Sequence, residues 1–316
     1  MNNATIRSEL EAWLDANWSP DLTLKEWRNR LVDGGWAASH WPEAFFGRGF
    51  NPEQTRVVQA VFTERHIVPA ASVGPRGIAS ETILAHGTDE QKLRYLKPIL
   101  TGEHSWCQLF SEPGSGSDLA GSSTKAELVD DEWVMNGQKV WNTSAHHADF
   151  GILLARTNFD LPKHQGLSYF LIDMRQSGVE VRPLKQMNGH ASFNEVFMTN
   201  AKVAKGDLLG GEGNGWAVAA TTLSYERQGF RRARSNTLDL NRPGQVYEEY
   251  KLELAIANEP YTWYPQREGR ADLALPRAKE TGAIHDSATR QELAKLISMQ
   301  QANRLAAAAA EAIGRS

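Results

Sequence analysis

The most informative segment of this 316-residue chain is Cys107–Asp118, which reads CQLFSEPGSGSD. Its glycines, Gly114 and Gly116, remove the Cβ barrier to tight turns, so the loop can present successive backbone N–H groups to a phosphate or a flat ring. The spacing does not fit a phosphate-binding loop or the dinucleotide fingerprint, because Leu119 stands where the third glycine belongs. A hydrolase elbow, Gly-x-Ser-x-Gly, is also absent. On this segment alone, an ordinary turn and a ligand-binding loop are equally supported.

The chain before this segment is predicted to be helical. Apolar residues recur at spacings of three and four, at Ile6, Leu10, Trp13 and Leu14 and later at Val57, Val58, Val61 and Phe62. The glycine-rich stretch Trp36–Phe50 separates the two patterns and contains Pro42, so a continuous helix is not expected there. Thr88–Gln91 matches a capping box and predicts a helix that ends at Gly102.

After Glu103 the pattern changes towards the alternation of strands. Short runs at 132–135, 151–155 and 167–172 are separated by turn residues, and the pattern continues to about Leu209. Asn136-Gly137 predicts a tight hairpin turn between two strands, because such turns need positive φ at both central residues. On a regular strand Trp141 and Thr143 would face the same way, so Trp141 could pack on a flat ring while Thr143 hydrogen-bonds the edge of that ring. The alternative is that Trp141 is a half-buried core residue. The region is expected to form a compact β-sandwich or barrel.

The helical period returns past Gly215. It is carried by Trp216, Ala219, Ala220 and Leu223. The segment Arg231–Gly282 has several prolines and many charges, so we expect a loop with uncertain helical pieces. From Asp286 onward, Leu293, Leu296, Ile297 and Leu305 predict one long helix that includes the alanine run Ala306–Ala310.

Composition excludes several classes of protein. The chain has 34 Lys and Arg against 38 Asp and Glu, a formal charge of −4, which argues against a nucleic-acid binder. The single cysteine, Cys107, excludes an intramolecular disulfide and a cysteine-ligated zinc or iron–sulfur centre. Neither a signal peptide at Met1–Glu9 nor an apolar window long enough for a membrane span is found, so a cytoplasmic protein of two or three domains is expected.

Three segments together resemble the acyl-CoA dehydrogenase family. They are Cys107–Asp118, the run NGQKVWNT at Asn136–Thr143 and the run GGEGNGW at Gly210–Trp216, in matching order and spacing. Gly87–Lys92 and Leu100–Glu103 resemble the same family's N-terminal domain. The resemblance implies an α+β multidomain fold: an N-terminal α-helical domain at 1–104, a middle β domain at 105–210 and a C-terminal α-helical bundle at 211–316, apparently shortened. It also implies FAD as cofactor, an acyl-CoA substrate and an oligomeric enzyme reoxidised by an electron-transfer flavoprotein or a similar carrier.

The resemblance assigns roles to individual residues. Phe110 and Ser111 would contact the isoalloxazine, Trp141 would pack on the ring, and Thr143 would hydrogen-bond near its reactive nitrogen. The residues expected to bind the cofactor are Gln108, Phe110, Ser111, Ser117, Trp141, Asn142 and Thr143. Those expected near the substrate are Ser117, where the thioester tail would pass, Ser224 and Arg227.

The reaction of this family requires a base for the α-proton of an acyl thioester. Glu226, in the run LSYER at Leu223–Arg227, is expected to be that base, because the family places it either on this helix or in a C-terminal segment that would follow Ser316. A general base must lie within about 3 Å of the proton that it removes and be partly desolvated. The alternative is that Glu226 forms a structural ion pair with an arginine.

Two departures from the family pattern support a second hypothesis. The Arg-x-x-Phe-Gly segment that grips the FAD diphosphate from a neighbouring subunit is not found in Arg231–Gly282, and a late Gly-Gly segment is not found before the chain ends. A non-catalytic subunit of a hetero-oligomeric acyl-CoA dehydrogenase would fit this pattern, and a related flavin oxidase is a weaker option. No metal site is expected, since His146 and His147 would point to opposite faces of a strand.

Overall fold

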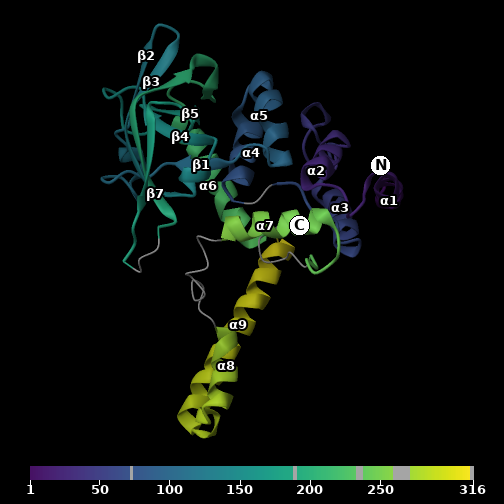
Figure 1. Cartoon of the computed structure of the whole chain (residues 1–316). Helices are drawn as coiled ribbons and strands as arrows, with labels where there is room; N and C mark the ends of the chain where they lie inside the picture. The colour runs from purple at the N-terminus through teal and green to yellow at the C-terminus, as the bar shows by residue number, and fades with distance from the viewer. Residues whose placement is uncertain (72–73, 188–190, 233–237, 259–270, 314–316) are drawn as a thin grey trace. The chain divides into compact units, whose positions relative to one another are not determined.

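The computed structural model describes residues 1–71, 74–187, 191–232, 238–258 and 271–313 (Figure 1). The chain forms two compact units, Met1–Pro260 and Tyr261–Ser316. No helix in the described ranges is both long and apolar enough to cross a membrane.

The first unit begins with five helices. They are α1 (Asn3–Asn17), α2 (Leu24–Asp33), α3 (Pro52–Glu64), α4 (Pro75–His86) and α5 (Asp89–Thr101). The predicted capping box at α5 is confirmed, because Thr88 Oγ1 accepts from Gln91 N while Gln91 Oε1 accepts from Thr88 N. The helix ends at Gly102 with a left-handed φ of 82°, as predicted. The interruption around Trp36–Phe50 holds only the short helix η1 (Glu43–Phe45).

Tryptophan side chains fill the core between these helices. Trp27 is fully buried and donates its indole N–H to Val68 O at 2.7 Å. The ring of Trp18 meets it edge-on at 4.5 Å, and the ring of Trp13 lies at 5.9 Å. The spacing Ile6, Leu10 and Leu14 buries one face of α1 in the same core, which confirms the predicted helical pattern.

The β domain follows as one eight-stranded sheet. Its strands are β1 (Trp106–Leu109), β2 (Lys125–Val129), β3 (Glu132–Thr143), β4 (Phe150–Arg156), β5 (Leu167–Asp173), β6 (Val179–Leu184), β7 (Phe193–Ala204) and β8 (Leu208–Leu209). Short 3-10 helices interrupt them at η2 (Leu119–Gly121), η3 (Ala145–His147) and η4 (Lys205–Asp207). The order is β6-β7-β3-β2-β4-β5-β8, with β1 paired in parallel to β4. The three strand runs predicted from alternation are therefore confirmed as parts of β3, β4 and β5.

The sheet encloses a core of its own. Trp133 from β3 meets Phe170 from β5 edge-on at 5.3 Å, although their strands are not neighbours in the sheet. Met135, Leu153 and Val196 belong to the same buried cluster. Side chains of separate strands thus pack face to face, and the predicted middle β domain is confirmed.

The hairpin predicted at Asn136-Gly137 is wrong. Both residues lie inside β3, and the β2–β3 turn is at Asp130-Asp131, where Asp130 has a φ of 55°. A Cβ on Gly137 would lie 2.6 Å from Thr124 Oγ1 and 2.8 Å from Thr124 Cα, so glycine is needed for the close approach of Thr124, the residue before β2. Asn136 pairs with Asn200 of β7, from which its Oδ1 accepts the backbone N–H at 2.9 Å. Ladder pairing on both sides therefore outweighs the local turn preference.

Two helices follow the sheet in the first unit, α6 (Gly215–Arg232) and α7 (Gln245–Asn258). Arg231–Gly282 was expected to be a loop with helical pieces, and the described part of that range contains such pieces as α7 and as α8 (Ala271–Glu280). Val246, Tyr247 and Tyr250 bury one face of α7. Tyr247 donates its hydroxyl to His66 O at 2.8 Å, which joins α7 to the N-terminal helices.

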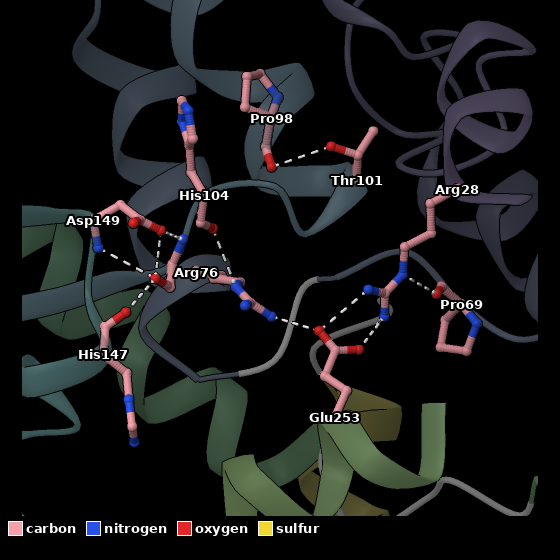
Figure 2. Close-up of polar contacts among 10 residues, drawn as sticks. Arg28, Pro69, Arg76, Pro98, Thr101, His104, His147, Asp149 and Glu253 are labelled. Atoms are coloured by element: carbon pink, nitrogen blue, oxygen red, sulfur yellow. Dashed lines mark hydrogen bonds and ion pairs between the residues drawn. The ribbon is translucent and has the colours of Figure 1, made fainter. Parts of the chain in front are cut away.

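A part-buried ion cluster also holds α7. Figure 2 shows Glu253 of α7 between two arginines, Arg28 of α2 and Arg76 of α4. Arg28 binds both carboxylate oxygens, Arg76 Nη1 binds Oε1 at 2.6 Å, and the Arg76 Nε donates to His104 O at 3.2 Å. Burial would raise the pKa of Glu253, but the hydrogen bonds and charges of the two arginines hold it below its ordinary value.

The second unit contains α8 (Ala271–Glu280), η7 (Ala283–His285) and α9 (Ser287–Ile313). The helix predicted from Asp286 onward is confirmed as α9. Gly282, with a φ of 75°, and η7 form the turn between α8 and α9. Leu293 and Leu296 of α9 are half-buried, whereas Ile297, Met299 and Leu305 are exposed.

Candidate active site

Two segments of the predicted site lie side by side. Gln108–Ser111 runs out of β1, and Lys139–Asn142 lies in β3. Three hydrogen bonds join them: Asn142 Nδ2 to Gln108 O at 2.8 Å, Lys139 Nζ to Phe110 O at 2.9 Å and Val140 N to Ser111 O at 2.9 Å. The structure therefore brings most of the predicted cofactor-binding residues together, although they are about 30 positions apart in the sequence.

Trp141 stands out in this group. Its φ is 62°, which is strained for a bulky residue, and its side chain is 57% exposed with its ring edge-on to Phe193 at 5.9 Å. The cause is a β-bulge: Lys139 pairs with Val196 and Asn142 with Asn194, so β3 holds one residue more than β7 here. A strained backbone that exposes a large aromatic ring is typical of ligand-binding positions. Thr143 is half-buried beyond the buried Asn142.

The proposed base reaches the same group from α6. Glu226 is half-buried, and its Oε2 accepts a hydrogen bond from Gln108 Nε2 at 3.4 Å. The contact is long, but it joins residues 118 positions apart in the chain. It places the carboxylate beside the end of β1, next to the Phe110–Ser111 segment.

A hydroxyl network fixes α6 one turn before Glu226. The Thr222 hydroxyl lies 3.0 Å from that of Tyr169 in β5 and 3.2 Å from that of Thr82 in α4. Next to it, His86 Nε2 lies 2.9 Å from Thr221 Oγ1, and burial lowers the pKa of His86. Tyr169 also meets the ring of Phe110 edge-on at 5.8 Å. This buried tyrosine therefore touches both the helix of the base and the segment of the predicted flavin contacts.

Sequence reasoning missed this network. Burial raises the pKa of Tyr169, which keeps its hydroxyl protonated and able to donate. No local signal identifies Thr82, Thr222 or Tyr169, because a threonine in a helix and a tyrosine in a strand are ordinary at those positions. Only the packing of α4 and β5 on α6 brings them together.

The remaining predicted residues lie farther out. Ser117 is exposed, two residues after a turn that is closed by paired backbone hydrogen bonds between Glu112 and Ser115, at 2.8 and 3.0 Å. No hydrogen bond or ion pair among the described residues joins Ser117 to the Gln108–Trp141 group. Ser224 and Arg227 are both exposed on α6, and Ser224, two positions before Glu226, lies on nearly the opposite face of the helix.

The geometry expected for His146 and His147 is wrong. These residues lie in η3, a 3-10 helix, and their ring centroids are 3.9 Å apart. Within the described ranges, no group of three or more His, Cys, Asp and Glu residues is arranged to hold a metal ion.

Comparison with known proteins agrees with this arrangement. The profile of the acyl-CoA dehydrogenase N-terminal domain matches residues 3–103, and that of the acyl-CoA dehydrogenase middle domain matches residues 107–201, together more than half of the chain. The chain belongs to the acyl-CoA dehydrogenase family. The resemblance and the fold class predicted from the sequence are thereby confirmed.

The chain covers different shares of the length of individual family members. IpdE1 of Mycolicibacterium smegmatis is 37% identical over 270 residues, 74% of this chain and 69% of that protein. FadE34 of Mycobacterium tuberculosis is 47% identical over 198 residues, but these are 62% of this chain and 27% of FadE34. The chain thus spans only about a quarter of FadE34.

Solved structures of the family share the fold. The Tcur3481-Tcur3483 steroid ACAD has a TM-score of 0.61 at 23% identity, covering 96% of this chain and 73% of that chain. The ChsE4-ChsE5 complex from Mycobacterium tuberculosis has a TM-score of 0.52 at 26% identity, covering 71% of this chain and 60% of that chain.

Proposed function

We propose that this chain acts in an FAD-dependent acyl-CoA dehydrogenase that introduces an α,β double bond into an acyl-CoA thioester. The observation that carries the proposal is the hydrogen bond between Gln108 and Glu226, since it sets a carboxylate against the segment that holds the proposed flavin contacts. A base and a hydride acceptor must approach neighbouring carbons of one substrate, so this juxtaposition is what the reaction requires.

The residues present fit a flavin. An exposed indole at Trp141 offers a flat apolar face, and the neighbouring hydroxyls of Ser111 and Thr143 are half-buried and polar. Asn142 adds a buried carboxamide whose Oδ1 has no partner among the described residues, an unsatisfied polar group of the kind found at functional sites. FAD, when bound, would supply the hydride acceptor. Gln108, Phe110, Ser111, Trp141, Asn142 and Thr143 are the residues that we propose hold it.

Glu226 is the proposed general base. Its carboxylate takes the α-proton of the thioester onto an oxygen, while the β-hydrogen leaves as hydride. Gln108 donates to Oε2, which restrains the carboxylate and leaves Oε1 for the substrate proton. Because Thr222 fixes α6 one turn earlier, the base is held by the fold rather than by solvent contacts. Ser117, Ser224 and Arg227 remain proposed substrate contacts.

A second candidate function is that of a non-catalytic subunit. The specific observation is the likeness to the ChsE4-ChsE5 complex, a family structure of two different chains. In this reading, the chain completes the flavin site of a partner subunit, and an electron-transfer flavoprotein or similar carrier accepts electrons from the assembly. The two candidates differ in whether FAD binds to the chain expressed alone.

The test uses flavin absorbance. The protein is purified alone and after coexpression with a second acyl-CoA dehydrogenase homologue, and it should be yellow. Its absorbance near 450 nm should fall when a suitable acyl-CoA is added. The acyl-CoA compounds tested form a series of chain lengths and of branched or polycyclic acyl groups. Glu226→Gln should keep the colour and slow bleaching by about 10²–10⁴-fold, which is what a positioned base contributes. Glu127→Gln, an exposed glutamate paired with Lys125, is the matched control.

The outcomes separate the candidates. Bleaching by the chain alone supports the catalytic proposal, and colour only in the coexpressed assembly supports the subunit role. Undiminished bleaching in Glu226→Gln would remove Glu226 as the base and leave it as a structural residue.

A further inference from the structure

A buried ion pair lies directly behind the proposed flavin segment. Lys139 is fully buried and Glu112 is 6% exposed, and Lys139 Nζ donates to Glu112 Oε1 at 2.8 Å. Burial raises the pKa of the Glu112 carboxyl, but the charge and hydrogen bond of Lys139 outweigh it and hold the pKa to about 2. Burial lowers the pKa of Lys139 to about 8 against the opposing effect of Glu112, so both groups are charged at pH 7.

The pair joins three separate backbone segments. The Lys139 ammonium also donates to Phe110 O at 2.9 Å. The Glu112 carboxylate accepts three further hydrogen bonds: from Ser123 N at 2.7 Å, Ser123 Oγ at 2.8 Å and Thr124 N at 2.9 Å. Residues 110–112, 123–124 and 139 are thereby fixed to one another by charged groups.

Stability alone is a weak reason for such a pair. Removing two charges from water is costly, and a buried ion pair is often no more stabilising than apolar side chains of the same size. An apolar replacement would fill the space, but it could not bind the Phe110 carbonyl or the two loop amides. What the charged pair supplies is therefore a defined geometry of these segments.

The fixed geometry is that of the proposed flavin contacts. The Lys139 ammonium binds the carbonyl of Phe110, and Glu112 directly follows Ser111, so the pair holds the Phe110–Ser111 segment at both ends. The bulge that exposes Trp141 begins directly after Lys139. Val140, the first bulge residue, donates to Ser111 O at 2.9 Å. Lys139 is thus bonded to the Phe110–Ser111 segment and directly precedes the Trp141 bulge.

We propose that Glu112 and Lys139 form a positioning pair that sets the Phe110–Ser111 segment and the Trp141 bulge in the arrangement that binds the flavin, without touching it. This inference rests on the proposed function. It assigns a role in cofactor affinity to two residues that the reaction itself does not use.

The test replaces the pair by neutral side chains of similar size, Lys139→Met with Glu112→Gln, so that the Gln oxygen can still accept from the loop amides. The apparent Kd for FAD, measured by flavin fluorescence in the same assembly state as the wild type, should rise by at least about tenfold, equal to about 1.4 kcal/mol. Hydrogen exchange of the Val140 amide should accelerate in the flavin-free protein, a readout that needs no cofactor. The control is Lys163→Met with Asp118→Asn, an exposed pair that joins Asp118 of the same loop to the β4–β5 connection and should leave both readouts unchanged.

Each result decides the proposal. A folded double variant whose Kd for FAD stays within twofold of wild type would overturn it. If that variant does not fold, Glu112→Asp, which keeps both charges but shortens one arm, replaces it with the same criteria, and failure of both to fold would overturn the positioning role in favour of a purely structural one. Absence of FAD binding by the wild type, alone and coexpressed, would instead reject the proposed function before the pair is tested.

Discussion

The two ion clusters of the first unit, one part-buried and one fully buried, have similar chemistry and different consequences. Glu253 with Arg28 and Arg76 joins α7 to α2 and α4 (Figure 2), so it connects helices that are distant in the chain. The Glu112–Lys139 pair lies inside the β domain and orders a loop and a strand that already belong to one sheet. An ion cluster therefore stabilises the arrangement of the segments that carry its members. The first cluster should therefore affect global stability, and the second should affect a local geometry.

The largest effect on stability is expected from Glu253→Gln. Arg28, whose side chain is 3% exposed, would lose its countercharge, and breaking a buried pair costs about 3–5 kcal/mol. Because Glu253 is itself 23% exposed, we expect a loss of about 2–4 kcal/mol in the free energy of unfolding, measured by urea denaturation. The control on the same helix, Glu248→Gln, breaks an exposed pair with Lys251 and should change stability by less than about 1 kcal/mol. Equal effects of the two variants would contradict the contribution of the Glu253 cluster to global stability.

Acid should weaken both clusters, in the same direction. The pKa values of Glu112 and Glu253 are below the ordinary 4.5, so the unfolded chain binds more protons than the folded chain as the pH falls. Their contribution is complete above about pH 4.5 and is lost below it, for Glu112 down to about pH 2. Unfolding free energies measured from pH 6 to pH 3 should fall less steeply in Glu253→Gln than in wild type. A parallel fall in both proteins would show that other carboxyl groups dominate.

A smaller effect is expected from Tyr169→Phe, which sharpens the comparison because it removes no charge. The ring can keep its contact with Phe110, while Thr222 loses the tyrosine hydroxyl, at a cost of about 1 kcal/mol. If Tyr169 positions α6, bleaching by an acyl-CoA should slow while the Kd for FAD stays near the wild-type value. The opposite split, weaker FAD binding with an unchanged bleaching rate, would place its role with Phe110 instead of Glu226.

Patterns that repeat along the chain were readable in the sequence. The strands at 151–155 and 167–172 were predicted because short apolar runs between turn residues form buried strands, and α9 because its apolar residues recur at helical spacing. The capping box at Thr88 was also readable, since its two hydrogen bonds join residues three apart. Local hydrogen bonding and periodic burial are the parts of folding that a single sequence expresses directly.

Features that depend on distant partners were not readable. Asn136-Gly137 has the composition of a turn, but pairing with β2 on one side and β7 on the other extends the strand through it. The bounds of helix α7 were not predicted within the expected helical pieces, because the apolar face of Val246, Tyr247 and Tyr250 lies in a charged region between prolines. For the site, the residues named from the family resemblance remain predictions, whereas the Glu112–Lys139 pair and the Thr222 network needed the packing of several elements to be seen.

The pairing of β3 with β7 limits how the lengths of these two strands can change. There are two irregularities along it, one with the extra residue in β7 near Asn200 and one with the extra residue in β3 at Val140-Trp141. They offset each other, so Glu132 opposite Ala204 and Thr143 opposite Phe193 are in the same register at the two ends. Deleting a residue from one bulge alone would slide half of the ladder by one position and turn its side chains to the other face. Insertions and deletions in these two strands should therefore be tolerated only in matched pairs, which links the length of β7 to the exposure of a tryptophan on its neighbour.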